Sequence, residues 1–123
     1  MSLNDELNKA KTEQAHGALY VLTNPAMPGV VKIGYTTSEV PTRMAELDRT
    51  PVPLPFSCFY AGYVENVQIQ EQRIHAIFAD RRLRPQREFF TVSPEQAKAA
   101  IELVAIRDVT PTLPEPTDNV KPN

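Results

Sequence analysis

Gly17-Ala-Leu-Tyr-Val-Leu-Thr-Asn24 and Gly29-Val-Val-Lys-Ile-Gly-Tyr35 are the two stretches of sequence that decide the fold. Both are rich in the β-branched and aromatic residues that favour strands. Between them lies the cluster Asn24-Pro-Ala-Met-Pro-Gly29, whose composition is typical of a turn. The pattern predicts a β-hairpin, with Tyr20 near the centre of its first strand and Lys32 near the centre of its second.

The rest of the chain continues with helices and strands in alternation. Apolar spacing and proline positions predict helices over 40–49, 67–79 and 94–107, and strands over 56–64 and 87–92. The residues expected to precede and cap these helices are Ser38, Asn66 and Ser93. The order β-β-α-β-α-β-α predicts an α+β domain, in which a small, mostly antiparallel sheet is flanked by helices.

Length and composition favour one domain. The chain has 123 residues, 41% of them hydrophobic, which suits a single modest core. We expect a polar N-terminal arm over 1–16, the folded domain over 17–107 and a proline-rich disordered tail over 108–123. No apolar run approaches a membrane span and the N-terminus has no signal-peptide pattern, so the expectation is a cytoplasmic protein without a membrane partner.

Charge is unevenly distributed along the chain. The net charge of −2 argues against indiscriminate binding of nucleic acid, but residues 17–107 contain ten basic and nine acidic residues. Arginines gather near the end of the second predicted helix and in the loop after it: Arg73, Arg81, Arg82, Arg84 and Arg87. The last four are candidates for contacts with the phosphates of a substrate. A solvated surface loop is the alternative explanation of the same pattern.

The hairpin motifs and three later features together resemble the GIY-YIG nuclease superfamily. Ala18-Leu19-Tyr20 is followed, after eleven residues, by Lys32-Ile33-Gly34. Arg43, Glu71 and an Arg-Glu-Phe-Phe run at 87–90 then follow in the order seen in a small phage and bacterial stand-alone branch of the superfamily. Lys32 departs from the pattern, because it stands where the superfamily usually has its second tyrosine.

The resemblance implies a role for each matching residue. Tyr20 would position or deprotonate the attacking water, Arg43 would bind the phosphate, and Glu71 would hold one Mg²⁺ or Mn²⁺. Lys32 would bind the phosphate or act as a base if burial lowered its pKa. Three further residues would support this site: Gly34, by letting its strand lie close to the next helix, and His75 and Glu88, by orienting Glu71 or the arginines.

Residue chemistry agrees with part of this assignment and leaves alternatives open. Glu71 and His75 share the edge of the apolar stripe of their helix, where a half-buried carboxylate suits a divalent ion. Three simpler structural explanations are a pair of Glu71 with an arginine, a hydrogen bond between Glu71 and His75 along the helix, and a pair of Arg43 with Glu46. A phenol has a pKa of about 10, so Tyr20 is a poor base unless Lys32 or a metal ion stabilises its phenolate.

The sequence therefore predicts a divalent-metal-dependent DNA endonuclease. The alternative is a catalytically weak or inactive nucleic-acid-binding module of the same fold, and a third possibility is a small protein-interaction domain. A domain of this size has no appended helix-turn-helix or zinc finger to recognise bases. We therefore expect specificity to come from DNA structure, from a homodimer or from a partner protein.

Overall fold

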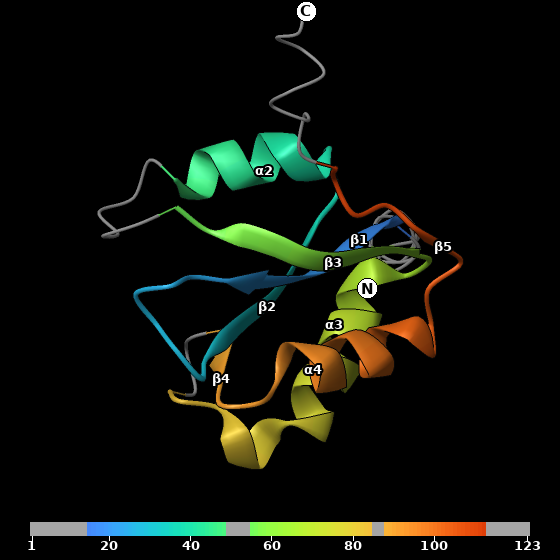
Figure 1. Cartoon of the computed structure of the whole chain (residues 1–123). Helices are drawn as coiled ribbons and strands as arrows, with labels where there is room; N and C mark the ends of the chain where they lie inside the picture. The colour runs from blue at the N-terminus through green and yellow to red at the C-terminus, as the bar shows by residue number, and fades with distance from the viewer. Residues whose placement is uncertain (1–14, 49–54, 85–87, 113–123) are drawn as a thin grey trace, which may run out of the picture.

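The described residues 15–48, 55–84 and 88–112 of the computed structural model are organised around a five-stranded antiparallel sheet. Its strands are β1 (Gly17–Thr23), β2 (Val31–Thr36), β3 (Ser57–Val64), β4 (Phe89–Phe90) and β5 (Arg107–Asp108). They lie in the order β4-β2-β1-β3-β5, so β1 is central (Figure 1). The α+β fold class expected from the sequence is confirmed.

The hairpin expected from the sequence is formed by β1 and β2. Their register places Tyr20 directly opposite Gly34. In the turn, Asn24 Oδ1 accepts a hydrogen bond from the backbone N–H of Ala26 at 2.9 Å. Gly29 has a φ of +78°, a left-handed conformation that glycine adopts without strain. Local turn chemistry thus supports the register that brings Tyr20 beside Gly34.

Within the described ranges, three helices cover the two faces of the sheet. They are α2 (Val40–Leu47), α3 (Val67–Ile77) and α4 (Pro94–Glu102), with a short 3₁₀ turn, η1 (Ala79–Arg81), after α3. Leu19 and Val21 of β1 belong to the hydrophobic cluster that includes residues of α3 and α4, whereas Tyr20 belongs to the cluster that includes residues of α2. Figure 1 shows α2 on one side of the sheet and α3 with α4 on the other. Alternation along β1 therefore assigns Tyr20 to the α2 side.

The starts of α2 and α3 differ from the expected capping. α2 begins after Glu39 rather than after Ser38, whose hydroxyl group instead makes a 2.8 Å hydrogen bond with Thr36 Oγ1. Asn66 does precede α3, but its backbone is left-handed, with a φ of 54°, and its side chain makes no capping hydrogen bond. α3 also ends earlier than expected, at Ile77, because the chain then turns into η1.

α4 starts as expected and ends early. Ser93 Oγ accepts a hydrogen bond from Gln96 N at 3.1 Å, and both halves of the expected capping box are present. The helix stops at Glu102 rather than near Arg107, because residues 107–108 pair with β3 as β5. This pairing satisfies backbone groups on an edge that would otherwise remain open. The expected element order thus lacked one strand.

Some expectations concern residues outside the described ranges. They include most of the N-terminal arm, the helix end near Arg49, the side chain of Arg87 and the tail beyond residue 112. Within the described ranges, each helix is too short or too polar to cross a lipid bilayer.

Candidate active site

The candidate active site lies along β2, at the point where pairing with β4 stops. β4 pairs with only Val31 and Lys32. At the next position, the backbone N–H of Ile33 donates to the carbonyl of Glu88 at 2.9 Å, and the carbonyl of Ile33 contacts His75 Nε2 at 2.9 Å. A side chain of α3 therefore satisfies the strand edge that β4 leaves open. This arrangement brings α3 and Glu88 to the middle of β2.

Glu71 on α3 has a buried carboxyl group. Its side chain is 12% exposed, and its Oε2 is buried without a hydrogen-bond partner among the described residues. Burial, and next the negative charge of Glu88, raise the pKa of Glu71 to about 7. The group is therefore only partly ionised at neutral pH, and an added positive charge would favour the carboxylate.

His75 lies one turn further along α3 and is as buried as Glu71. Because a carbonyl oxygen only accepts, His75 Nε2 must carry the proton and donate it to Ile33. The same Nε2 lies 3.8 Å from Glu71 Oε2, and burial lowers the pKa of His75. His75 thus ties α3 to β2 as a neutral ring. It positions Glu71 through the helix rather than through a direct hydrogen bond.

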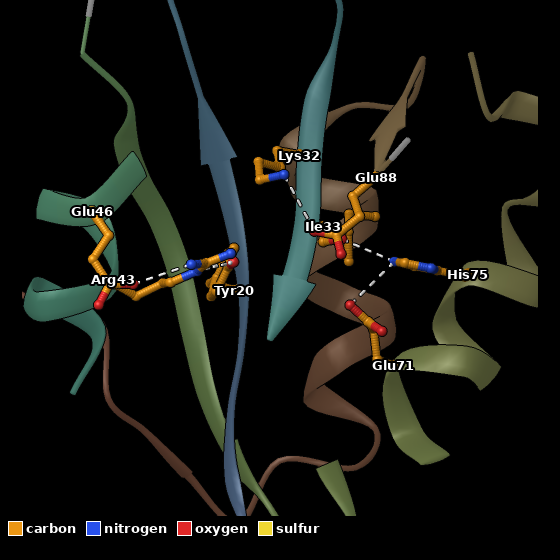
Figure 2. A network of polar contacts seen from close by, with 8 residues as sticks. All are labelled: Tyr20, Lys32, Ile33, Arg43, Glu46, Glu71, His75 and Glu88. Atoms are coloured by element: carbon orange, nitrogen blue, oxygen red, sulfur yellow. Dashed lines mark hydrogen bonds and ion pairs between the residues drawn. The ribbon is translucent and has the colours of Figure 1, made fainter. Parts of the chain in front are cut away.

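Glu88 occupies the centre of the polar cluster. Its Oε1 lies 3.3 Å from Lys32 Nζ, and its carboxyl group is close enough to raise the pKa of Glu71. A Cβ atom placed on Gly34 would lie 2.5 Å from this Oε1 and 2.7 Å from the Tyr20 hydroxyl oxygen. Figure 2 shows Glu88 at the β2 edge, between Lys32 and His75. From the sequence, Glu88 was expected only in a supporting position.

Gly34 is required for a different reason from the one expected. From the sequence, the missing side chain was expected to let β2 approach the next helix. The atoms nearest to an added Cβ belong instead to two polar side chains, those of Glu88, just before β4, and of Tyr20, directly opposite on β1. The expected reason was wrong, because these side chains fill the space above Gly34.

Tyr20 and Arg43 contact each other across the α2 side of the sheet. Arg43 Nε donates to the Tyr20 hydroxyl oxygen at 3.4 Å, and Arg43 Nη1 lies 3.1 Å from Glu46 Oε1. The pairing with Glu46 that the spacing predicts and a contact with Tyr20 are therefore both made by one guanidinium group. Tyr20 is only 1% exposed. Burial raises the pKa of its hydroxyl group by more than the hydrogen bond from Arg43 lowers it.

Lys32 interacts with Glu88 rather than with Tyr20. Its side chain is 13% exposed, and its Nζ lies 3.3 Å from Glu88 Oε1 and 5.1 Å from the centre of the Phe89 ring. From the sequence, Lys32 was a candidate for the cation that stabilises a Tyr20 phenolate. In the structure, Arg43 is the cation in contact with the Tyr20 hydroxyl group.

The candidate phosphate-binding arginines occupy different environments. Arg82 is half-buried, lies 5.6 Å from the centre of the Phe90 ring, and its charge lowers the pKa of Glu71. Arg81 is exposed, and its Nη1 donates to the carbonyl of Thr91 at 3.4 Å. Arg84 is exposed in the loop, and Arg87 lies outside the described residues. Among the described members of this group, Arg82 is the arginine whose charge lowers the pKa of Glu71.

One sequence signal pointed to Glu88. Glu88 directly precedes the Phe-Phe pair, whose composition favours a strand. Because this strand pairs with Lys32, Glu88 lies close to the middle of β2. The contact between His75 and the Ile33 carbonyl has no such signal, because it depends on where β4 ends. Within the described ranges, no group of three or more His, Cys, Asp or Glu residues is placed to hold a metal ion. The carboxyl groups available at this site are those of Glu71 and Glu88.

We expect the carboxyl group of Glu71 to lower stability as the pH rises from about 4.5 to about 7. Below pH 4.5 the carboxyl group is protonated in both the folded and the unfolded chain. Between pH 4.5 and 7 the unfolded chain releases a proton that the folded protein retains. Relative to Glu71→Gln, the wild type should lose about 3 kcal/mol of unfolding free energy across the window. Urea unfolding of both proteins at several pH values measures this difference. Parallel profiles would contradict the assignment of a raised pKa.

Comparison with known proteins identifies the family of this fold. A family model described as the T5orf172 domain matches residues 17–105, from β1 to the end of the α4 region. No curated protein and no solved structure gives a significant match to the chain. The matched segment includes Tyr20, Lys32, Arg43, Glu71 and Glu88. Because it covers well over half of the sequence, the chain belongs to the T5orf172 domain family.

Proposed function

We propose that this protein is a divalent-metal-dependent endonuclease of the GIY-YIG type, which hydrolyses phosphodiester bonds in DNA. The observation that supports the proposal most directly is the buried, unpartnered oxygen of Glu71 beside a second carboxyl group. Membership of the phage-associated T5orf172 family agrees with a nuclease or DNA-binding role. The spacing of the hairpin motifs supports the GIY-YIG type.

The residues present suit Mg²⁺ or Mn²⁺ at Glu71. These ions prefer oxygen ligands, and Mg²⁺ commonly uses one or two protein carboxylates together with water and phosphate oxygens. An ion at this position would pair the Glu71 oxygen that has no hydrogen-bond partner. When bound, such an ion supplies positive charge that stabilises the phosphate and the leaving oxygen.

Tyr20 is proposed to position the attacking water. Its hydroxyl group accepts a hydrogen bond from Arg43, so its own proton can be donated or shared with a water molecule. Because burial raises the pKa of Tyr20, a phenolate is disfavoured at neutral pH. Glu88 and Arg43 are partly exposed and lie next to this hydroxyl group. A water molecule would reach it when these two side chains move.

Lys32 and Arg43 are the proposed phosphate-binding groups. Without substrate, each contacts a carboxylate: Lys32 contacts Glu88 at 3.3 Å, and Arg43 contacts Glu46 at 3.1 Å. Phosphate oxygens accept the same charge-assisted hydrogen bonds as carboxylate oxygens. A DNA phosphate can therefore take over these contacts as it enters the site.

A non-cutting nucleic-acid-binding module is the second candidate. The observation that favours it is Lys32, which takes the place of the second motif tyrosine and is already engaged by Glu88. Tyr20, the remaining motif tyrosine, is buried and protonated. Such a module would bind DNA with strong salt dependence and yield no products.

A supercoiled-plasmid assay separates the two candidates. We expect the purified protein to produce nicked or linear DNA in Mg²⁺ or Mn²⁺, because the proposed chemistry needs the cation at Glu71. EDTA should stop cleavage, and excess Mg²⁺ should restore it. Intact plasmid in both metals, with a salt-sensitive mobility shift, would support the binding module. Neither cleavage nor binding at low salt would contradict both candidates.

A further inference from the structure

Glu88 stands next to Glu71, although the family resemblance implies a single glutamate at the metal. The two side chains come from different elements: Glu71 from α3, and Glu88 from the residue before β4. Their carboxyl groups are close enough for a side-chain hydrogen bond between them, which contributes to the raised pKa of Glu71. Two carboxyl groups at this separation repel each other when both are ionised.

The surrounding residues only partly compensate this pair. Glu71 Oε2 has no hydrogen-bond partner within the described part of the chain, because the nearby N–H of His75 Nε2 is donated to the Ile33 carbonyl. On the other side, Lys32 contacts Glu88 Oε1 at 3.3 Å. Lys32 and the half-buried Arg82 both lower the pKa of Glu71, yet burial and the charge of Glu88 keep that pKa raised. The buried Glu71 oxygen beside the Glu88 carboxyl group therefore leaves a place for a further cation.

The segments that carry the two glutamates are both held by the backbone of one residue, Ile33. Ile33 donates its N–H to the Glu88 carbonyl, and its own carbonyl accepts a hydrogen bond from His75, one turn from Glu71 on α3. The relative position of the two glutamates is therefore fixed by β2. Metal sites need ligands whose geometry is set by such supporting contacts.

We propose that Glu88 is a second carboxylate ligand of the divalent cation held by Glu71. The inference rests on the proposed function, since it concerns the same site. It replaces one glutamate ligand by two, Glu71 and Glu88. Two protein carboxylates remain within the number that Mg²⁺ accepts. Lys32 then competes with the cation for Glu88, so removal of its charge should preserve or strengthen metal binding.

Binding of Mn²⁺ to the full chain tests this inference without any cleavage readout. Electron paramagnetic resonance of unbound Mn²⁺ measures the affinity of the wild type and of the Glu71→Gln, Glu88→Gln and Lys32→Met variants. We expect each glutamine variant to bind Mn²⁺ at least about tenfold more weakly, and Lys32→Met to bind at least as tightly as the wild type. Glu102→Gln, at the exposed end of α4, is the matched control and should bind normally.

The outcomes separate this inference from the proposed function. Wild-type affinity in Glu88→Gln, with loss in Glu71→Gln, would overturn the second ligand and leave the nuclease proposal intact. Equal weakening in Glu88→Gln and Lys32→Met would also overturn it, because Glu88 would then act by positioning Lys32. Absence of Mn²⁺ binding in the wild type would contradict both proposals. If Glu88→Gln fails to fold by circular dichroism, Glu88→Asp, which retracts the carboxylate by one methylene, must show the loss.

Discussion

Replacement of Glu71 by glutamine is expected to lower the rate of plasmid cleavage by about three orders of magnitude, while the domain stays folded. Glutamine keeps the shape of the side chain and removes the charge that would hold the cation. Loss of a metal ion removes several kcal/mol of transition-state stabilisation, and about 4 kcal/mol corresponds to roughly a thousandfold in rate. Single-turnover cleavage of supercoiled plasmid in Mg²⁺ measures this loss.

Stability provides the control for this variant. Above pH 7 the wild type must keep a buried carboxyl group ionised, whereas the glutamine variant has no such cost. Glu71→Gln should therefore be at least as stable as the wild type at pH 8, so that a loss of cleavage cannot come from unfolding. Glu102→Gln, an exposed substitution on α4, should cleave at the wild-type rate. Normal cleavage by a folded Glu71→Gln variant would refute the proposal that Glu71 holds the divalent cation.

Substitution of Gly34 by alanine is the second change with a large expected effect. The added Cβ would lie 2.5 Å from Glu88 Oε1, 2.7 Å from the Tyr20 hydroxyl oxygen and 2.9 Å from Tyr20 Cε1. Glu88 is partly exposed and can turn away, but Tyr20 is 1% exposed and packed in the core. We expect a loss of about 1–3 kcal/mol in unfolding free energy and a fall of about a hundredfold in cleavage.

Urea unfolding and the plasmid assay measure the two parts of this effect. Gly29→Asn is the matched control: a Cβ there meets no atom within 4 Å, and asparagine tolerates the left-handed backbone of that turn. It should change stability and cleavage little. A Gly34→Ala variant with wild-type stability and wild-type cleavage would show that Tyr20 and Glu88 are not held against this glycine.

The parts of the fold that the sequence predicted depend on contacts within one element or one turn. The β-branched runs on both sides of the Asn24–Gly29 turn predicted the hairpin, and Ser93 with Gln96 predicted the start of α4. Such signals are short in range, because neighbouring residues supply both the pattern and the partner. Where a local signal had a competitor, as at Ser38, whose hydroxyl group bonds to Thr36, the expected helix start was displaced.

Single-element spacing also predicted part of the candidate site. Helical spacing placed Glu71 and His75 together at the edge of a buried face, and both side chains are 12% exposed there. The i to i+3 spacing of Arg43 and Glu46 predicted their pairing, which the structure contains at 3.1 Å. The chemical roles of Glu71, His75 and Arg43 in cleavage remain proposals.

The amino-acid pattern alone predicts which side chains share one face of a strand or helix, because strand and helix periodicities are properties of the local chain. The contacts of Glu88 with Lys32 and of His75 with the Ile33 carbonyl arise from the packing of separate elements. The same packing explains why no side chain fits at Gly34 without displacing Glu88 or Tyr20. These contacts depend on β4 pairing with just two residues of β2, which leaves backbone groups at the strand edge unpaired. Such groups must find partners wherever the fold brings donors and acceptors close. The pairing of β5 with β3, unexpected from sequence, has the same physical origin.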